Sequence, residues 1–172
     1  MTNSKERFAH SYLLYGLIRG LNFVIENDIR KDLKKIKMNF SSFRILWILY
    51  FYSNINISEL TYLTQTNISN VTRQLTKLKE EGMVLIKIGH DARAKELSLT
   101  EDGQRVVYDF IKRNEEDSEI QLTHLVEKIS ENDFATFVGG LSVLSNELLG
   151  KNFNEFVKKS SAELLNKSAS TQ

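Results

Sequence analysis

Hydrophobic residues recur along most of this chain at the three-to-four-residue spacing of one helix face, and the pattern changes only between residues 83 and 100. There, the segments 83–88 and 95–100 are rich in β-forming residues or alternate polar with apolar positions, which predicts two strands. The periodic segments predict helices over residues 8–36, 43–50, 57–64, 67–81, 101–128, 130–150 and 153–165. The expected N-caps include Ser41 or Ser42 for the second helix and Thr100 for the fifth. We therefore predict a mainly α-helical fold with one small β-hairpin.

The segment 67–81 has both a start and a stop signal for a short helix. Asn67 can accept hydrogen bonds from the first-turn backbone as N-cap, and Gly82 can take the left-handed conformation that ends a helix. The inward stripe consists of the apolar residues Ile68, Val71, Leu75 and Leu78. The outward face consists of Ser69, Asn70, Arg73, Thr76 and Lys77, with Thr72 and Gln74 nearer to the stripe. Such donors suit phosphates and base edges, but they are equally common on an ordinary solvated helix.

The neighbouring segments favour DNA contact. Leu60 and Leu63 give the helix over 57–64 an inward face, and only Gln65 and Thr66 separate it from the helix over 67–81. Two short helices joined so tightly form a helix-turn-helix, whose second helix enters the major groove of DNA. Residues 89–94 supply a polar, basic tip between the two strands, as in a wing. The order of these parts predicts a winged helix-turn-helix.

Residues 57–103 resemble the winged helix of MarR-family transcriptional regulators. The resemblance includes the wing pattern Asp91-x-Arg93, followed by Leu97-x-Leu99-Thr100-x-x-Gly103. It extends more weakly over residues 8–150, and the tail over 151–156 resembles the longer Hpr/ScoC-like branch. The resemblance implies one domain, with residues 41–100 as the winged-helix module and residues 8–36 and 101–165 as the helical dimerisation region.

The predicted function is sequence-specific DNA binding by a dimeric repressor that recognises an inverted-repeat operator. The helix 67–81 is expected in the major groove, and the wing 83–100 carries Arg93 toward the minor groove, where Asp91 holds it, as the resemblance implies. The expected DNA-contacting residues are Asn67, Ser69, Asn70, Thr72, Arg73, Gln74, Thr76, Lys77, His90, Asp91, Arg93 and Lys95.

This prediction has one alternative, and the resemblance adds one possible ligand site. A winged helix can bind protein and not DNA, although Arg73, Lys77 and Arg93 would then have no physical reason to be present. The resemblance also implies a small aromatic ligand between the dimer helices and the winged module. The residues that could line such a site are Tyr12, Tyr15, Trp47 and Tyr50. Aromatic residues at helical spacing more often belong to a core.

The helix over 8–36 carries more apolar surface than one packing face needs. We expect a second copy of the chain to cover that surface, and an intramolecular helical bundle is the alternative. The formal net charge of +1 is unevenly divided, with +5 over residues 1–54, +1 over 55–100 and −5 over 101–172. The basic excess lies mainly in Arg30, Lys31, Lys34, Lys35 and Lys37. We interpret these cations as complementing the C-terminal dipole of a helix.

Other chemistry finds little support in the sequence. The chain has no cysteine, which excludes disulfides, thiolate metal sites and thiol-based redox sensing. Its histidines, His10, His90 and His124, stand at no recognisable catalytic or metal-binding spacing. We expect neither enzymatic activity, nor a metal, nor a cofactor. The sequence has no apparent signal peptide and no run of about 18 apolar residues, so a cytoplasmic protein without a membrane partner is expected.

Overall fold

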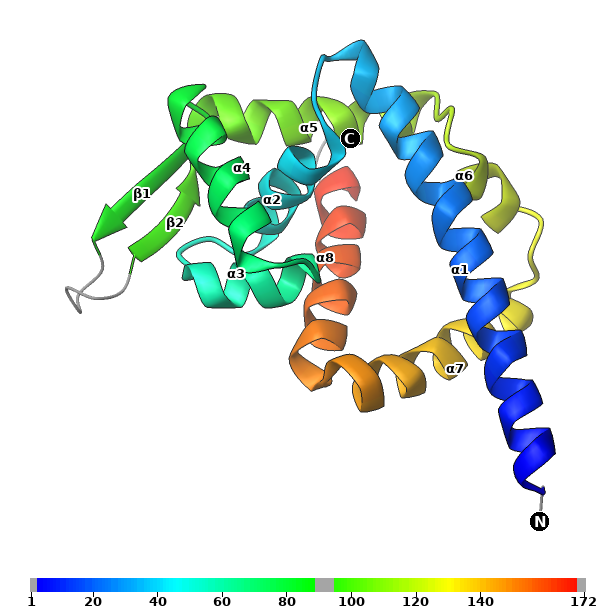
Figure 1. Cartoon of the computed structure of the whole chain (residues 1–172). Coiled ribbons are helices and arrows are strands. Elements are labelled where there is room, and N and C mark those ends of the chain that lie inside the picture. Colours follow the sequence, from blue (N-terminus) through cyan, green and yellow to red (C-terminus); the bar gives the residue numbers. More distant parts are fainter. Residues whose placement is uncertain (1–2, 89–94, 170–172) are drawn as a thin grey trace.

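The computed structural model describes residues 3–88 and 95–169 and has eight helices and one two-stranded sheet in that part of the chain (Figure 1). The helices are α1 (Ser4–Lys35), α2 (Phe40–Phe51), α3 (Ile57–Thr64), α4 (Ile68–Glu80), α5 (Glu101–Glu116), α6 (Gln121–Val126), α7 (Glu131–Leu149) and α8 (Lys151–Ala169). The strands are β1 (Val84–Ile88) and β2 (Lys95–Leu99). The predicted fold class, a mainly helical winged helix with one hairpin, is confirmed.

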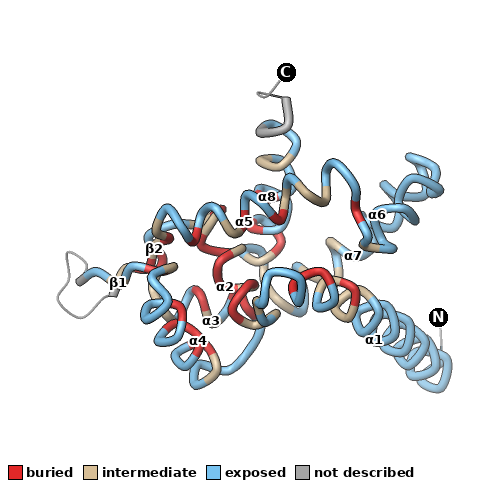
Figure 2. Tube along the Cα trace, turned by 90° about the horizontal axis from the view of Figure 1, so that it is seen from above, coloured by how far each residue is buried: buried red, intermediate tan, exposed pale blue. Residues whose placement is uncertain are grey.

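The hydrophobic core lies in the winged-helix module, between α2, α3, α4, the hairpin and α5. Figure 2 shows the buried residues gathered there. Side chains with no more than 2% exposure include Leu46, Leu60, Val71, Leu78 and Leu97. Helix α5 adds Val107 and Phe110, and α8 adds Phe156. Segments on both sides of residue 100 therefore share one core.

A single β-bridge between Ile55 and Leu97 joins the hairpin to the segment before the helix-turn-helix. Strands β1 and β2 are antiparallel, with Val84 opposite Leu99 and Ile86 opposite Leu97. The Leu97 backbone also pairs with the segment before α3: its N–H donates to the Ile55 carbonyl at 3.0 Å, and its carbonyl accepts from Asn54 at 2.9 Å. The base of the wing is therefore held on two sides.

The start of α5 packs closely against the base of the hairpin. Thr100 is its N-cap, as predicted, and its hydroxyl donates to the Gly82 carbonyl at 2.7 Å. A Cβ atom at Gly103 would overlap the Met83 carbonyl oxygen. Because a backbone atom cannot move aside like a side chain, this approach requires glycine.

Several predicted helix boundaries are wrong. Asn39, and neither Ser41 nor Ser42, caps α2; its side chain accepts from the Ser42 N–H at 2.8 Å. The predicted helix over 101–128 ends at Glu116, and α6 begins at Gln121. Ser118 stabilises the break, because its hydroxyl accepts from the Ile120 N–H at 3.2 Å. Helix α8 begins at Lys151 and not at Phe153.

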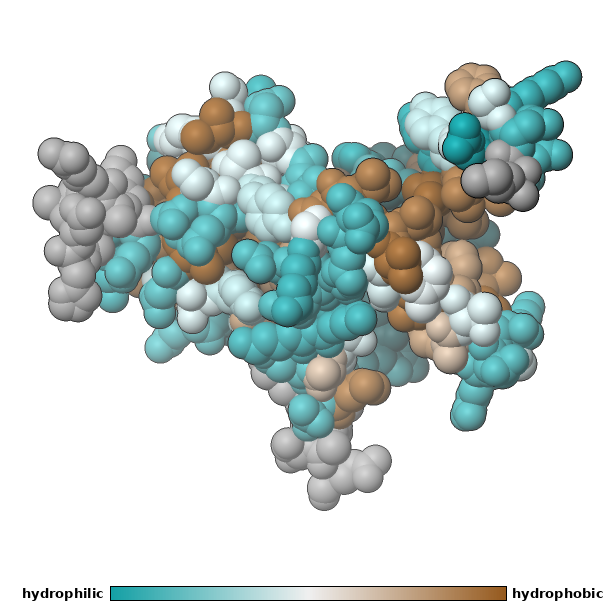
Figure 3. All heavy atoms as spheres, turned by 90° about the horizontal axis from the view of Figure 1, so that it is seen from below, coloured by the Kyte–Doolittle hydropathy of each residue, from teal (hydrophilic) through white to brown (hydrophobic). Residues whose placement is uncertain are grey.

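Outside the winged module, the apolar faces of α1, α6 and α7 are largely uncovered. Helices α6 and α7 are fully described and contain no buried residue, and α1 buries only Asp28, Asp32 and Leu33. These helices extend away from the core in Figure 1, and Figure 3 shows an apolar area in the half of the molecule opposite the hairpin. The described residues therefore do not form the alternative intramolecular bundle. No helix within the described ranges is long and apolar enough to cross a membrane.

Helix α8 returns from α7 to the winged module (Figure 1). The hydroxyl of Tyr62 on α3 donates to the Leu149 carbonyl at 2.5 Å and accepts from the Phe153 N–H at 3.1 Å. Further along α8, Phe156 meets the Tyr52 ring edge-on at 5.5 Å, and the Lys159 ammonium lies 4.8 Å from the same ring centroid. The C-terminal helix is thus attached directly to the helix-turn-helix.

Candidate nucleic-acid interface

The two helices of the helix-turn-helix have well-defined ends. Asn56 and Glu59 form a capping box at the start of α3, and Gln65 takes a left-handed conformation at its end, with φ 50°. Asn67 is the N-cap of α4, as predicted, and its side chain accepts from the Asn70 N–H at 2.8 Å. These hydrogen bonds satisfy backbone groups that a helix leaves unpaired at its ends.

The end of α4 is a Schellman motif. The Gly82 N–H donates to the Lys79 carbonyl at 3.0 Å, and the Met83 N–H donates to the Leu78 carbonyl at 2.8 Å. Gly82 has φ 72°, as predicted for a left-handed C-terminal position. The turn leads the chain directly into β1. The turn at Gly82 therefore fixes the direction of α4 relative to the wing.

The inward stripe of α4 differs from the prediction at two positions. Val71, Leu75 and Leu78 are buried, but Ile68 is 54% exposed and faces solvent. Gln74, predicted among the DNA-contacting residues, is only 9% exposed. Its side-chain oxygen accepts from the Ser42 hydroxyl at 2.8 Å and from the Asn39 amide at 3.4 Å. Placing Gln74 on the DNA-contacting face is wrong, because its polar group is turned into the module to pair with α2.

The remaining predicted contacts on α4 lie on its outer face. Five of these residues are exposed: Ser69, Thr72, Arg73, Thr76 and Lys77. Asn70 is half-buried, and its side-chain oxygen accepts from the Arg73 guanidinium at 3.0 Å. Lys77 has a long, exposed ion pair with Glu81 at 3.7 Å. This face therefore offers two cations and several hydroxyl groups to a partner.

The wing residues can be placed only in part. His90, Asp91 and Arg93 lie outside the described residues. Lys95 is the first residue of β2, opposite Ile88 in the register of the hairpin. Lys87 and Glu96 are neighbours in the same ladder. The two strands therefore lead toward the segment that carries the predicted minor-groove residue.

The four aromatic residues proposed for a ligand site do not meet in one described cavity. Tyr12 and Tyr15 are 71% and 64% exposed on α1. Trp47 packs on α2 against Phe51 and Phe110, and Tyr50 contacts Phe51 edge-on. Of the four, Trp47 lines a described cavity, of about 370 Å³, between α2, α5 and α8. Within one chain, the predicted aromatic cluster is thus divided between two regions.

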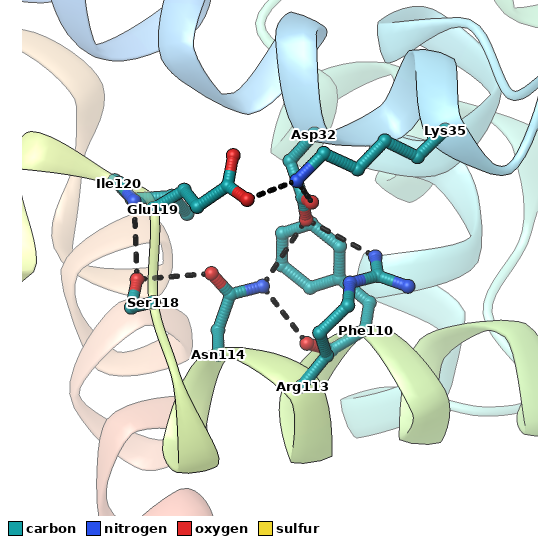
Figure 4. A network of polar contacts seen from close by, with 8 residues as sticks. All are labelled: Asp32, Lys35, Phe110, Arg113, Asn114, Ser118, Glu119 and Ile120. Atoms are coloured by element: carbon teal, nitrogen blue, oxygen red, sulfur yellow. Dashed lines mark hydrogen bonds and ion pairs between the residues drawn. The ribbon is translucent and has the colours of Figure 1, made fainter.

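A polar network joins α1 to α5 and was not found from the sequence (Figure 4). The Asp32 carboxylate accepts from the Arg113 guanidinium at 3.1 Å and from the Asn114 amide at 3.2 Å. Lys35 lies 3.5 Å from Asp32 and 2.7 Å from Glu119. More than 80 residues separate Asp32 from Arg113, so no local pattern relates them. This network connects the long N-terminal helix to the helix that leaves the wing.

Hydrogen bonds and ion pairs shift the pKa values of Asp32 and Lys35 in this network and of Asp28 one turn earlier on α1. Burial of Asp32 raises the pKa of its carboxyl, but the hydrogen bonds from Arg113 and Asn114 and the nearby cations outweigh burial, and its pKa is below the ordinary value. A hydrogen bond from Lys31 is the largest cause of the lowered pKa of Asp28. The hydrogen bond to Glu119 raises the pKa of Lys35. Lys31 and Lys35 thus form ion pairs with Asp28 and Asp32 of the same helix. The interpretation that the basic cluster complements the helix dipole applies to Lys34 and Lys35, which lie in the last turn of α1.

The described side chains suggest no other chemistry at this surface. Within the described ranges, no group of three histidine, aspartate or glutamate side chains could hold a metal ion. The site consists of an exposed polar helix face beside a hairpin, supported by a capped turn. These features define a winged helix-turn-helix protein.

Comparisons with known proteins agree with this class. A model of the MarR family matches residues 38–87, which contain α2, α3, α4 and most of β1. No curated protein matches the chain by sequence. The Hpr/ScoC-like assignment of the tail stays a prediction.

Solved structures of MarR-type regulators have the same fold. The chain is similar to MepR of S. aureus in complex with DNA, at 19% identity and a TM-score of 0.67, over 78% of this chain and 97% of that chain. It is similar to FabT of Streptococcus pneumoniae in complex with DNA, at 18% identity and a TM-score of 0.59, over 83% and 96%. It is also similar to the apo form of MarR from E. coli, at 19% identity and a TM-score of 0.62, over 76% and 96%.

Proposed function

We propose that this chain is a sequence-specific DNA-binding transcriptional regulator. The exposed face of α4 carries the proposal, because Arg73, Ser69 and Lys77 project from a helix whose two ends and inner face are fixed. A rigid helix that presents a guanidinium and hydroxyl groups suits the major groove. The match of residues 38–87 to the MarR family and the similarity to two regulators solved with DNA support this proposal.

The proposed regulator acts as a homodimer on an inverted repeat. Large apolar side chains on α1 and α7 support a second copy as the partner: Phe8, Tyr12 and Leu148 are each more than 70% exposed. Soluble monomers rarely leave such extended apolar surface uncovered. A two-fold dimer would place both copies of α4 on one face of the duplex, with half-site centres about 10 bp apart or a multiple of that distance. Occlusion of a promoter in the cytoplasm, hence repression, is the proposed outcome.

The cavity beside Trp47 supports a small aromatic ligand as effector of this regulator. Its lining includes the apolar side chains of Phe110, Ile111 and Leu164, from α5 and α8. Trp47 is the only tryptophan of the chain, so tryptophan fluorescence comes from a side chain that lines this cavity. Saturable quenching by benzoate would support the effector proposal, and an unchanged spectrum would contradict it for this ligand class.

DNA binding is tested by selecting duplexes from a random library with the purified protein and measuring their affinity by fluorescence anisotropy at one fixed salt concentration. Arg73→Ala should weaken binding by about 1–3 kcal/mol and relax the preference for one base pair. Arg105→Ala on α5 is the matched control, since Arg105 is also an exposed arginine and is paired only weakly with Asp102 at 3.5 Å. Equal affinity of parent and Arg73→Ala proteins would contradict the groove assignment. Failure to bind any duplex at low salt would leave the protein-interaction module as the better function.

A further inference from the structure

A polar cavity of about 180 Å³ lies beside the start of α4, and of its lining residues only Asn70 belongs to the predicted DNA-contacting set. Four elements meet there: the C-terminal third of α1, the start of α2, the turn after α3 and the first turn of α4. The polar side chains in its lining include Glu26, Arg30, Ser41, Arg44, Thr66 and Asn70. The cavity therefore joins segments that are separated by more than 40 residues in the sequence.

Arg44 is a cation in this cavity without a partner. Its side chain forms no hydrogen bond or ion pair with the described residues, although it is half-buried. Burial lowers the pKa of its guanidinium, and the charge of Glu26 acts in the opposite direction. Glu26 is already paired with Arg30 at 3.0 Å. The lining thus holds two arginines and one carboxylate, an excess of one positive charge.

The other groups in the lining favour an oxyanion as the missing partner. Arg30 lies over the Phe40 ring at 4.5 Å, which holds its guanidinium at the same cavity. The Thr66 hydroxyl accepts from the Asn70 amide at 3.4 Å and so retains its own proton for donation. The Ser41 hydroxyl is half-buried and has no hydrogen-bond partner among the described residues. A guanidinium and hydroxyl donors in one cavity are groups that suit a phosphate oxyanion.

The cavity borders the outer face of α4. Asn70 belongs to both, because it lines the cavity and its side-chain oxygen accepts from the Arg73 guanidinium at 3.0 Å. When α4 lies in a major groove, the sugar-phosphate backbone at the groove edge passes beside the first turn of this helix. Contacts with that backbone fix the register of a protein on the duplex, and base contacts then supply the specificity.

We propose that this cavity binds one phosphate group of the DNA backbone, with Arg44 as the charged ligand and Ser41 and Thr66 as hydroxyl donors. The proposal rests on the proposed DNA-binding function and adds a contact from α2, outside the helix-turn-helix. A single phosphate contact adds affinity that does not depend on sequence and that falls with salt, since binding releases a counterion.

The test compares Arg44→Gln with Arg105→Gln, using duplexes selected by the parent protein and a scrambled duplex over a series of salt concentrations. For Arg44→Gln we expect weaker binding to all duplexes by a similar factor and a salt slope lower by about one, with unchanged base preference. Arg105→Gln should behave like the parent protein. Arg73→Ala serves as the reference for a lost base contact.

Arg44→Lys is a second variant in case Arg44→Gln does not fold, because lysine keeps the positive charge and lacks the planar guanidinium. Thermal unfolding of each variant shows whether it is folded. Arg44→Lys should retain the parent salt slope and bind more weakly. If Arg44→Gln is unfolded, Arg44→Lys decides the test: an affinity for DNA equal to that of the parent protein would contradict the proposed phosphate site.

Inorganic phosphate, titrated without DNA by calorimetry, distinguishes a backbone phosphate from a free ion. If Arg44→Gln binds DNA like Arg105→Gln while Arg73→Ala loses affinity, the phosphate site is wrong and the DNA-binding function stands. If the parent protein binds no duplex but binds phosphate in an Arg44-dependent way, the proposed function and the assignment to DNA both fail. A lower salt slope for Arg44→Gln supports the proposal whether or not free phosphate also binds.

Discussion

The hydroxyl of Ser42 donates a hydrogen bond of 2.8 Å to the side-chain oxygen of Gln74, and both residues are buried between α2 and α4. Ser42 is completely buried, so its hydroxyl has no access to water if Gln74 is lost. Gln74→Leu should therefore lower the free energy of unfolding by about 1–3 kcal/mol, the usual cost of a buried donor left unsatisfied, because the Ser42 hydroxyl then keeps only the hydrogen bond that it accepts from the Asn39 amide at 2.9 Å. Denaturant unfolding of the purified protein measures this change.

The double variant Ser42→Ala/Gln74→Leu is the control for that pair. It removes both polar partners, so it should be less destabilised than the sum of the two single variants. Strictly additive effects would mean that the hydrogen bond does not couple α2 to α4. Gln74→Leu should also keep the base preference of the parent protein, because the side chain points away from the proposed DNA face.

Gly103 should be intolerant of substitution, in contrast to the glycines of α7. Gly103→Ala forces a Cβ atom against the Met83 carbonyl oxygen and should destabilise the protein by about 1–3 kcal/mol through overpacking. Gly139→Ala meets no neighbouring atom within 4 Å in the chain and should stabilise α7 by about 0.5–1 kcal/mol. Thermal unfolding of both variants decides the matter. Equal melting temperatures would contradict the close approach of α5 and the hairpin.

Acid should weaken the attachment of α1 to α5. The pKa of Asp32 is lowered in the folded protein, so its pairing with Arg113 stabilises the fold above the ordinary carboxyl pKa. That contribution is lost as the pH falls from the ordinary value, near 4, through the lower value of the folded state. Asp32→Asn should reduce stability at pH 7 by about 1–3 kcal/mol and flatten its acid dependence. Unfolding measured between pH 7 and pH 2 tests this.

Asp109→Asn is the control for Asp32→Asn, since Asp109 is exposed on α5 and no hydrogen bond or ion pair to it is found among the described residues. It should follow the pH profile of the parent protein. An Asp32→Asn profile that coincides with both would show that the Asp32–Arg113 contact contributes no net stability.

The Tyr62 hydroxyl should govern how firmly α8 is attached. Tyr62→Phe removes the hydrogen bonds to the Leu149 carbonyl and the Phe153 N–H, each of which contributes about 1 kcal/mol in typical proteins. We expect faster hydrogen exchange at the Phe153 amide, with little change in the core of the winged module. Tyr108→Phe, an exposed tyrosine on α5, provides the comparison. Unchanged protection of Phe153 would refute a role for this hydroxyl.

The sequence by itself determined the features that depend on neighbouring residues. Asn67 and Gly82 mark the ends of α4, and Thr100 marks the start of α5, because caps act on backbone groups within one turn. The two strands were also predicted, since alternation and flanking glycines are local signals. Together with their order along the chain, these signals were sufficient for the winged-helix fold.

Only the tertiary structure decided the features that depend on distant partners. Gln74 turns inward because Ser42, 32 residues earlier, offers its hydroxyl, and Ile68 is left exposed although it continues the apolar stripe. Asp32 is buried with Arg113 across 81 residues, and Arg44 meets the start of α4 only after α2 packs against it. Periodicity reports which face of a helix is apolar, whereas the partner of each polar side chain depends on which helices meet.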